Sequence, residues 1–212
     1  MTRNQFKLYV YVDGESHYMR ARESCLQAFG DVGAMDKLRS NLPMARAVVK
    51  HECQFFWDAG YLYTVRPDKV YYFTSVVTGS ENDLHDYHVF LRTRGNVEPY
   101  IIHEKSQLQK RREDIREKSG LIEKPKGLDI ALTTKLLEDA VNDNFTHCHL
   151  FTSDVDYIPV IEAVKRLGKV VHVYGHRNGL GKHSKLEYIP DEFHDIGTDF
   201  MKNRYSITTK EG

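Results

Sequence analysis

The sequence predicts an α/β fold: a three-layer α/β/α arrangement with a mostly parallel central sheet and a helical elaboration in the N-terminal half. Two observations support this expectation. Short apolar runs rich in Val, Ile and Tyr alternate with longer segments of helical periodicity, and acidic residues directly follow two of these runs. Alternating strands and helices are typical of a parallel sheet with helices on both faces.

In the N-terminal half, three strands and three helices are expected. The first strand, Phe6 to Val12, is a short Val- and Tyr-rich run that stops at the turn pair Asp13-Gly14. The other elements expected here are helices at 15–29, 35–50 and 81–94 and strands at Lys69 to Val77 and Val97 to His103.

In the C-terminal half, the helix from Gly127 to Val141 is the clearest element, because its leucines recur at helical spacing. The segment 105–118 is strongly charged and fits an exposed helix or a mobile loop. The remaining expected elements are strands at His147 to Thr152, Lys169 to Tyr174 and around Phe193 to Ile196, a helix from Val155 to Leu167, and a helical turn near Asp199. One domain over residues 1–212 is the simplest interpretation, with 17–96 as its less recognisable part.

Composition narrows the class of protein. The chain has 212 residues and a formal net charge of zero, so a nucleic-acid partner would need a local basic patch rather than an overall basic charge. Its three cysteines are far apart and form no C-x-x-C pair, which disfavours a disulfide framework and fits a reducing cytosol. The sequence shows no signal peptide and no stretch long enough to span a membrane. We therefore expect a cytoplasmic protein without a membrane partner.

Four carboxylates are placed where a ligand site is expected. Asp13 and Asp154 directly follow two predicted strands, whose carboxyl ends meet at one edge of a parallel sheet. Asp156 and Asp129 lie at the starts of two helices that can approach the same edge. Such an oxygen-rich set suits Mg²⁺ or Mn²⁺. The chemistry indicated is metal-assisted hydrolysis of a phosphate ester.

A plainer interpretation stands beside this one. An Asp after a strand or in the first turn of a helix is a common capping residue. Taken singly, Asp129 and Asp156 fit caps better than ligands, and Asp13-Gly14 fits a turn. The metal-site hypothesis rests on the combination of these acids with the strand order.

Three blocks of sequence resemble the NYN domain family, a branch of the PIN-like nuclease superfold. They are YVYVDGES at 9–16, KGLDIAL at 126–132 and LFTSDVDYIPVIEAVKRLGKVV at 150–171, with a weaker match over 184–193. The likeness covers 6–16 and 97–196 well and 17–96 poorly. It implies a parallel sheet, a divalent metal ion and RNA cleavage, and it places Asp13, Asp129, Asp154 and Asp156 in the acidic site.

Two positions depart from the family pattern. Ser16 stands where the family usually has Asn, and it can still form a hydrogen bond. Lys135 stands where the helix often carries a second Asp. Lys135 would either shrink the acidic site or meet a substrate phosphate.

Basic segments could hold an RNA backbone. Between Lys165 and Lys185 there are six Lys or Arg residues and no acid. We expect Arg177, Lys182 and Lys185 to bind substrate, together with Ser16 and with Lys126. From Lys105 to Lys126 there are eight basic residues against four acids, which fits a solvated face equally well. Tyr18 and Tyr157 would either stack on bases or belong to the core.

Three functions remain open on sequence grounds. The first is a metal-dependent endoribonuclease. The second is a catalytically weak or inactive NYN module that binds RNA or another protein, which Ser16 and Lys135 favour. The third is a phosphatase or small-nucleotide hydrolase, against which the basic stretch counts. The sequence also leaves open whether residues 17–96 select substrate, form a homodimer surface or cover the sheet.

Overall fold

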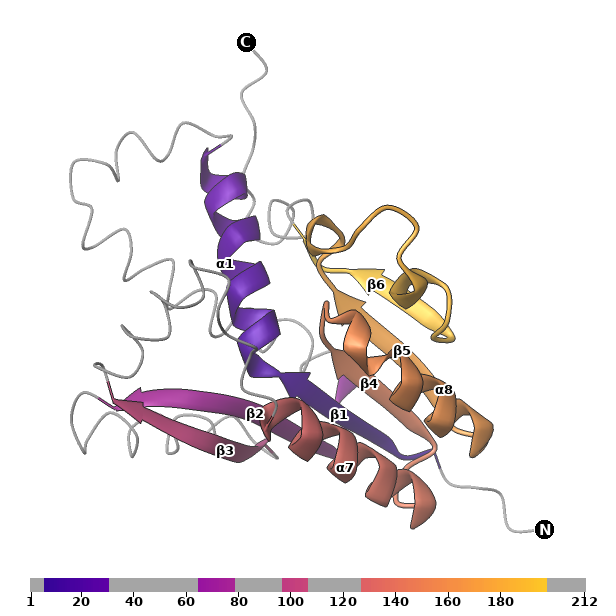
Figure 1. The fold of residues 1–212 in the computed structure, drawn as a ribbon. Coiled ribbons are helices and arrows are strands. Elements are labelled where there is room, and N and C mark those ends of the chain that lie inside the picture. Colours follow the sequence, from indigo (N-terminus) through magenta and orange to yellow (C-terminus); the bar gives the residue numbers. More distant parts are fainter. Residues whose placement is uncertain (1–5, 31–64, 79–96, 107–126, 198–212) are drawn as a thin grey trace.

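The computed structural model describes residues 6–30, 65–78, 97–106 and 127–197. These residues form a six-stranded sheet in the order β3-β2-β1-β4-β5-β6, and every neighbouring pair is parallel (Figure 1). The strands are β1 (Leu8–Asp13), β2 (Lys69–Thr78), β3 (Val97–Ser106), β4 (His147–Phe151), β5 (Val170–Gly175) and β6 (Glu192–Asp195). The helices are α1 (Gly14–Gly30), α7 (Gly127–Val141) and α8 (Ile158–Arg166), with short 3₁₀ turns η1 (Val155–Tyr157), η2 (Arg177–Gly179) and η3 (Lys185–Glu187).

Most expected elements within these ranges are confirmed, with ends shifted by a few residues. The helix expected from Val155 to Leu167 is instead the 3₁₀ turn η1 followed by α8. Pro159 lies at the start of α8, where its missing N–H costs no helical hydrogen bond. The helices expected at 35–50 and 81–94, the turn near Asp199 and residues 107–118 lie outside the described residues.

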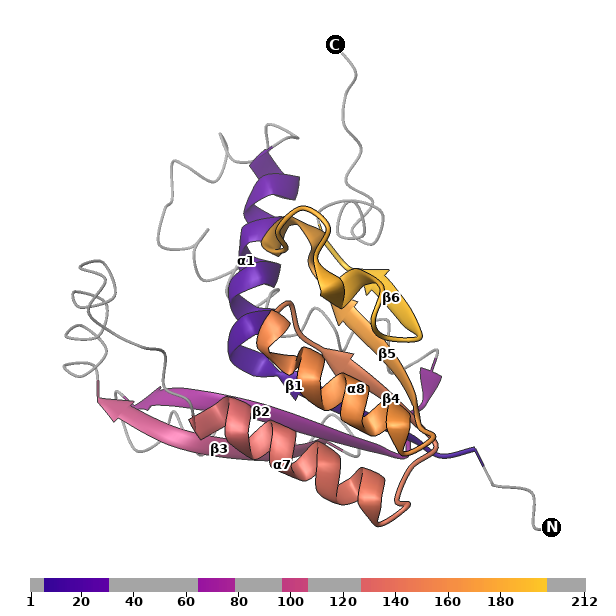
Figure 2. The same ribbon diagram turned by 45° about the vertical axis from the view of Figure 1, so that its right-hand side comes forward.

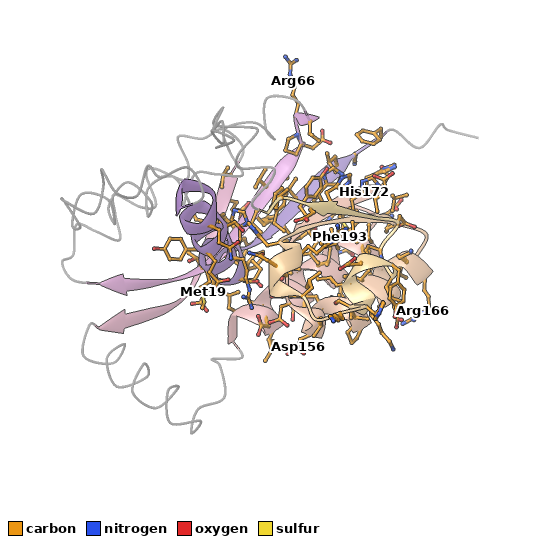
Figure 3. The ribbon with its side chains drawn as sticks, turned by 90° about the horizontal axis from the view of Figure 1, so that it is seen from above. Met19, Arg66, Asp156, Arg166, His172 and Phe193 are labelled. Atoms are coloured by element: carbon orange, nitrogen blue, oxygen red, sulfur yellow. The ribbon has the colours of Figure 1, made fainter. Side chains whose placement is uncertain are left out.

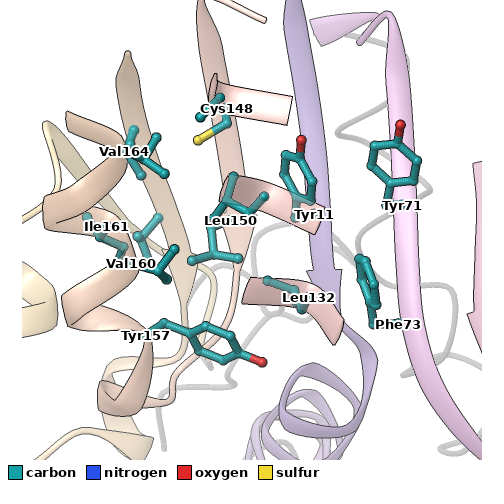
Figure 4. Close-up of a cluster of buried hydrophobic side chains, with 14 of the residues drawn as sticks. Tyr11, Tyr71, Phe73, Leu132, Cys148, Leu150, Tyr157, Val160, Ile161 and Val164 are labelled. Atoms are coloured by element: carbon teal, nitrogen blue, oxygen red, sulfur yellow. The ribbon is translucent and has the colours of Figure 1, made fainter. Parts of the chain in front are cut away.

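Helices α7 and α8 lie side by side on one face of the sheet (Figures 1 and 2). The core beneath them is made by alternate strand residues such as Tyr11 and Leu150, together with Leu132 of α7 and Ile161 of α8 (Figure 4). All four side chains are fully buried. Burial on this scale stabilises a fold by roughly 1.5–3 kcal/mol for each large apolar side chain.

Helix α1 packs on the opposite face. A Cβ on Gly14 would lie 2.6 Å from the carbonyl oxygen of Phe73 and 2.6 Å from the ring of Tyr72, so only glycine allows the chain to turn from β1 into α1 here. Three residues on, His17 meets the ring of Phe151 edge-on. The three-layer α/β/α fold with a parallel sheet is thereby confirmed.

The sheet is covered unevenly at its β5–β6 end. Val171 and Val173 of β5 are buried beneath α8, while the alternate residues His172 and Tyr174 face the other way and are half-buried. This alternation is the period-two pattern of a strand with one covered face. The half-buried face therefore carries imidazole and phenol groups that remain within reach of solvent.

Candidate active site

Asp13 is the most constrained of the predicted site residues. It is the last residue of β1, and its side chain is buried. The backbone N–H of Ser16 donates to its Oδ1 over 3.1 Å, and the Thr152 hydroxyl donates to its Oδ2 over 3.1 Å. The carboxylate thus caps the first turn of α1 and is fixed against the end of β4.

Asp154 is attached to the same network through Thr152. Its backbone N–H donates to Oγ1 of Thr152 over 3.0 Å. Its own Oδ1 accepts the backbone N–H of Asp156 over 3.0 Å, which caps the 3₁₀ turn η1. Because Thr152 contacts both acids, their relative position depends on the pairing of β1 with β4, in which Val12 lies opposite Phe151.

Asp129 reaches the site from the first turn of α7. The hydroxyl of Tyr157 donates to its Oδ1 over 2.9 Å, and the Tyr157 ring is buried in the core below α8 (Figure 4). The core interpretation of Tyr157 is therefore right, and a ring buried in this way cannot stack on a base. Its hydroxyl instead joins η1, the turn before α8, to the acid on α7.

Asp13, Asp129 and Asp154 form one electrostatic unit. Burial, helped by the negative charges of Asp129 and Asp154, raises the pKa of Asp13 to about 7, while the hydrogen bonds from Ser16 and Thr152 act to lower it. Burial likewise raises the pKa of Tyr157 well above its usual value, helped by the same three acids. A bound cation would offset the electrostatic cost of placing these acids together.

The spacing of the acids limits what cation they fit. Within the described residues, no three of Asp13, Asp129, Asp154 and Asp156 bring carboxylate oxygens within 4.8 Å of one another. Asp156 itself is exposed, and its backbone rather than its side chain meets Asp154. All the donors are hard oxygens, and Mg²⁺ keeps several waters while using only one or two carboxylates. The donor set therefore fits a hydrated hard divalent ion.

The predicted basic residues follow β5 at the carboxyl edge of the sheet. The start of their segment is tied to the acidic loop, because the backbone N–H of His176 donates to the Ser153 hydroxyl over 2.8 Å. Arg177, Lys182 and Lys185 are all exposed. The Arg177 side chain lies 3.5 Å from Glu187, which offsets part of its charge. Lys126 lies outside the described residues.

Ser16 and Lys135 have defined partners. The Ser16 hydroxyl accepts the backbone N–H of Ser153 over 3.3 Å, so it joins α1 to the acidic loop. The Lys135 ammonium donates to buried Asp139 over 2.9 Å, and Tyr11 donates to the other oxygen of that carboxylate over 2.7 Å. Lys135 therefore neutralises a buried acid of its own helix, a role that the sequence did not reveal.

Sequence reasoning missed two polar groups near the acids. Thr152 has a weak signal, since it directly precedes Ser153-Asp154 at a strand end. The other group is the buried pair His17 and His176, whose ring centroids are 5.7 Å apart. No pattern in the sequence indicates this pair. Burial lowers the pKa of His176 to about 4 and that of His17 well below its usual value, so both rings are neutral at pH 7. Ser24 lies 3.0 Å from Nδ1 of His176 and links α1 to this pair.

None of the described helices is long and apolar enough to cross a membrane. No curated protein matches the chain significantly. The chain is similar to the crystal structure of a protein of unknown function from Vibrio parahaemolyticus, with 18% sequence identity, a TM-score of 0.51, and coverage of 94% of this chain and 98% of that one. This likeness shows a shared fold. The model of the NYN domain matches residues 7–197, nearly the whole chain, and the chain therefore belongs to the NYN domain family, whose domains generally have a PIN-like nuclease fold.

Proposed function

We propose that the chain is a metal-dependent endoribonuclease that hydrolyses RNA phosphodiester bonds at the acidic site of Asp13, Asp129 and Asp154. The observation that supports this most strongly is the buried Asp13 carboxyl, whose pKa of about 7 reflects its burial beside two further acids. A protein keeps such a costly arrangement where a function uses it. NYN and PIN-like nucleases generally use divalent metal ions, and the hard oxygen donors here suit Mg²⁺ or Mn²⁺.

The ion would be held among Asp13, Asp129 and Asp154, by one or two of these carboxylates directly and by the others through its waters, with exposed Asp156 at the rim. When bound, it supplies a water of lowered pKa and positive charge for the phosphate oxygens. The protein's own contribution is to hold the acids: Thr152 positions Asp13 relative to Asp154, and Tyr157 positions Asp129. These bonds keep the carboxylates ordered without requiring them to move during the reaction.

The RNA backbone would lie along the segment after β5. Lys182 and Lys185 are exposed there, and Arg177 adds a planar guanidinium that is partly neutralised by Glu187. Lys126, directly before α7, and the Ser16 hydroxyl, beside the acidic loop, complete the proposed substrate contacts. A chain of spaced cations fits a polymer of phosphates better than a single nucleotide, which favours RNA over a small phosphate ester.

The test is cleavage of labelled single-stranded RNA by the purified chain with Mn²⁺ or Mg²⁺, beside Asp154→Asn and the control Glu162→Gln. Glu162 is an exposed acid on α8. We expect cleavage that needs the metal ion, is lost in Asp154→Asn and is kept in Glu162→Gln. Equal cleavage by the wild type and Asp154→Asn would contradict the proposal. RNA binding without cleavage would instead identify the chain as a catalytically inactive binding module.

A further inference from the structure

A second cluster of metal-ligand side chains lies on the sheet face opposite α7 and α8. It consists of His172 on β5 with Glu192 and His194 on β6, and their potential ligand atoms all lie within 4.8 Å of one another. Figure 3 shows His172 and Asp156 on opposite sides of the ribbon, so the cluster is separate from the acidic site. Within the described residues, it is the one set of at least three such groups drawn this close together.

Strand register brings the three side chains together. His172 is paired directly with Glu192 across β5 and β6, and His194 lies two residues further along β6. Residues two apart on a strand point to the same face, so all three project from one side of the sheet. This placement is set by the backbone pairing of two strands and does not depend on a flexible loop.

The spacing of the atoms is that of ligands around one ion. Oε2 of Glu192 lies 3.1 Å from Nε2 of His194 and 3.8 Å from Nδ1 of His172. Two ligands bound at tetrahedral angles to Zn²⁺ are about 3.4 Å apart, given metal–ligand bonds near 2.1 Å. Nε2 of His194 is also shielded from solvent and has no hydrogen bond of proper geometry to any described residue, although Glu192 is so close. Both observations are expected of metal-ligand atoms that point toward one shared ion.

Neighbouring rings hold the two imidazoles in place. The His172 ring stacks on that of His149 at 5.0 Å, and the His194 ring stacks on that of Tyr174 at 4.3 Å. Such supporting contacts fix the orientation of ligand rings before an ion arrives. The side chains are 22%, 59% and 36% exposed for His172, Glu192 and His194, so an ion can enter from solvent.

We propose that His172, Glu192 and His194 form a binding site for a borderline divalent cation such as Zn²⁺, distinct from the hard-ion site proposed at the acids. Two imidazoles and one carboxylate are donors that prefer Zn²⁺ to Mg²⁺. Three protein ligands leave a coordination position for water or for a fourth ligand. The site stands on residues outside the proposed nuclease machinery and does not depend on that activity.

The test is titration calorimetry of the metal-free, untagged full chain with Zn²⁺, in millimolar Mg²⁺ that competes for the acidic site. We expect one Zn²⁺ per chain, with affinity lowered at least tenfold in Glu192→Gln and in His194→Gln. Two controls are His183→Asn, which removes an exposed histidine at a left-handed backbone position that Asn tolerates, and Asp154→Asn in the acidic site. Both should bind Zn²⁺ as the wild type does.

Two results would overturn the proposal. One is the absence of Zn²⁺ binding by a wild-type chain that is folded by circular dichroism. The other is unchanged Zn²⁺ affinity in folded Glu192→Gln and His194→Gln, because the ion would then lie elsewhere. If the wild type did not cleave RNA, the Zn²⁺ titration would still decide this proposal, because it does not measure catalysis.

Discussion

The Thr152 hydroxyl joins two acids of the candidate site. It donates to Oδ2 of Asp13 over 3.1 Å and accepts the backbone N–H of Asp154 over 3.0 Å. Its bond to Asp13 stabilises the ionised carboxylate against the burial that raises its pKa to about 7. A single hydroxyl group therefore affects both the position and the charge of the site.

We expect Thr152→Val to shift the acidic limb of the pH–rate profile to higher pH. Valine keeps the shape of the side chain but cannot donate to Asp13, so the pKa of that carboxyl rises further above 7. The measurement is kcat against pH for metal-dependent RNA cleavage. Thr146→Val is the matched control, because the Thr146 hydroxyl bonds Lys7 at the opposite edge of the sheet. A profile that shifts equally in both variants would contradict this role for Thr152.

Asp13→Asn should stabilise the chain at pH 8 when no divalent ion is present. When the pKa of an acid is higher in the folded than in the unfolded state, its contribution to stability is fully present below the unfolded pKa, which is near 3.8 for Asp13. This contribution is lost as the pH rises through the folded pKa of about 7. The difference between the folded and unfolded pKa values of Asp13 corresponds to roughly 4 kcal/mol in the free energy of unfolding. Denaturant unfolding in EDTA at pH 4 and pH 8 measures the effect.

The same experiment includes its own control. The advantage of Asp13→Asn should largely vanish near pH 4, where the folded carboxyl is protonated and the unfolded one is about half protonated. Added Mg²⁺ should stabilise the wild type at pH 8 but not the variant, because an ion bound by Asp13 offsets the buried charge. A wild type that is the more stable protein at pH 8 in EDTA would show that Asp13 carries no such cost.

The sequence predicted the elements that depend on local pattern. The bounds of α7 follow from leucines at helical spacing, and β1 follows from a continuous apolar run that ends at Asp13. The shared edge of Asp13 and Asp154 follows from topology alone, because parallel strands end on one side of a sheet. These predictions needed no knowledge of which side chains touch.

The remainder depends on contacts between distant segments. The bond from Thr152 to Asp13 needs the register of β1 against β4, and the pairing of Lys135 with buried Asp139 is meaningful only because Tyr11 of β1 reaches the same carboxylate. The cluster of His172, Glu192 and His194 needs the β5–β6 register. Hydrophobic periodicity cannot specify register between strands joined by long crossovers, so a single sequence did not reveal these groups.

Tyr157→Phe should lower kcat about tenfold while leaving the core packed, because Asp129 loses the donor that holds it. Tyr11→Phe is the matched control: it removes a buried hydroxyl that donates to Asp139. We expect Tyr11→Phe to cost about 1–3 kcal/mol of stability with kcat of the folded enzyme unchanged. Measuring kcat and the free energy of unfolding for both variants separates positioning from packing. A similar fall of kcat in both would refute a specific role for Tyr157.

The double variant Lys182→Ala, Lys185→Ala should weaken RNA binding and flatten its dependence on salt. Each lost phosphate contact reduces the slope of log affinity against log salt by about 0.7 for a single strand. Arg166→Ala is the control, since Arg166 is an exposed cation at the far end of α8. Binding of labelled RNA at several salt concentrations measures the slope. If Arg166→Ala flattened it as much, the segment after β5 would not be the RNA-binding surface.

Lys135→Asp introduces the acid that the NYN resemblance leads one to expect at this position, yet we expect it to destabilise the chain rather than improve the site. Lys135 neutralises Asp139, which is buried and also accepts bonds from Tyr11 and Asn144. A second carboxylate here leaves two negative charges together and should cost at least about 3 kcal/mol. Lys135→Met, which removes the cation without adding an acid, should cost less. The free energy of unfolding for both variants tests this order, and a stable Lys135→Asp protein with raised cleavage activity would place residue 135 in the acidic site after all.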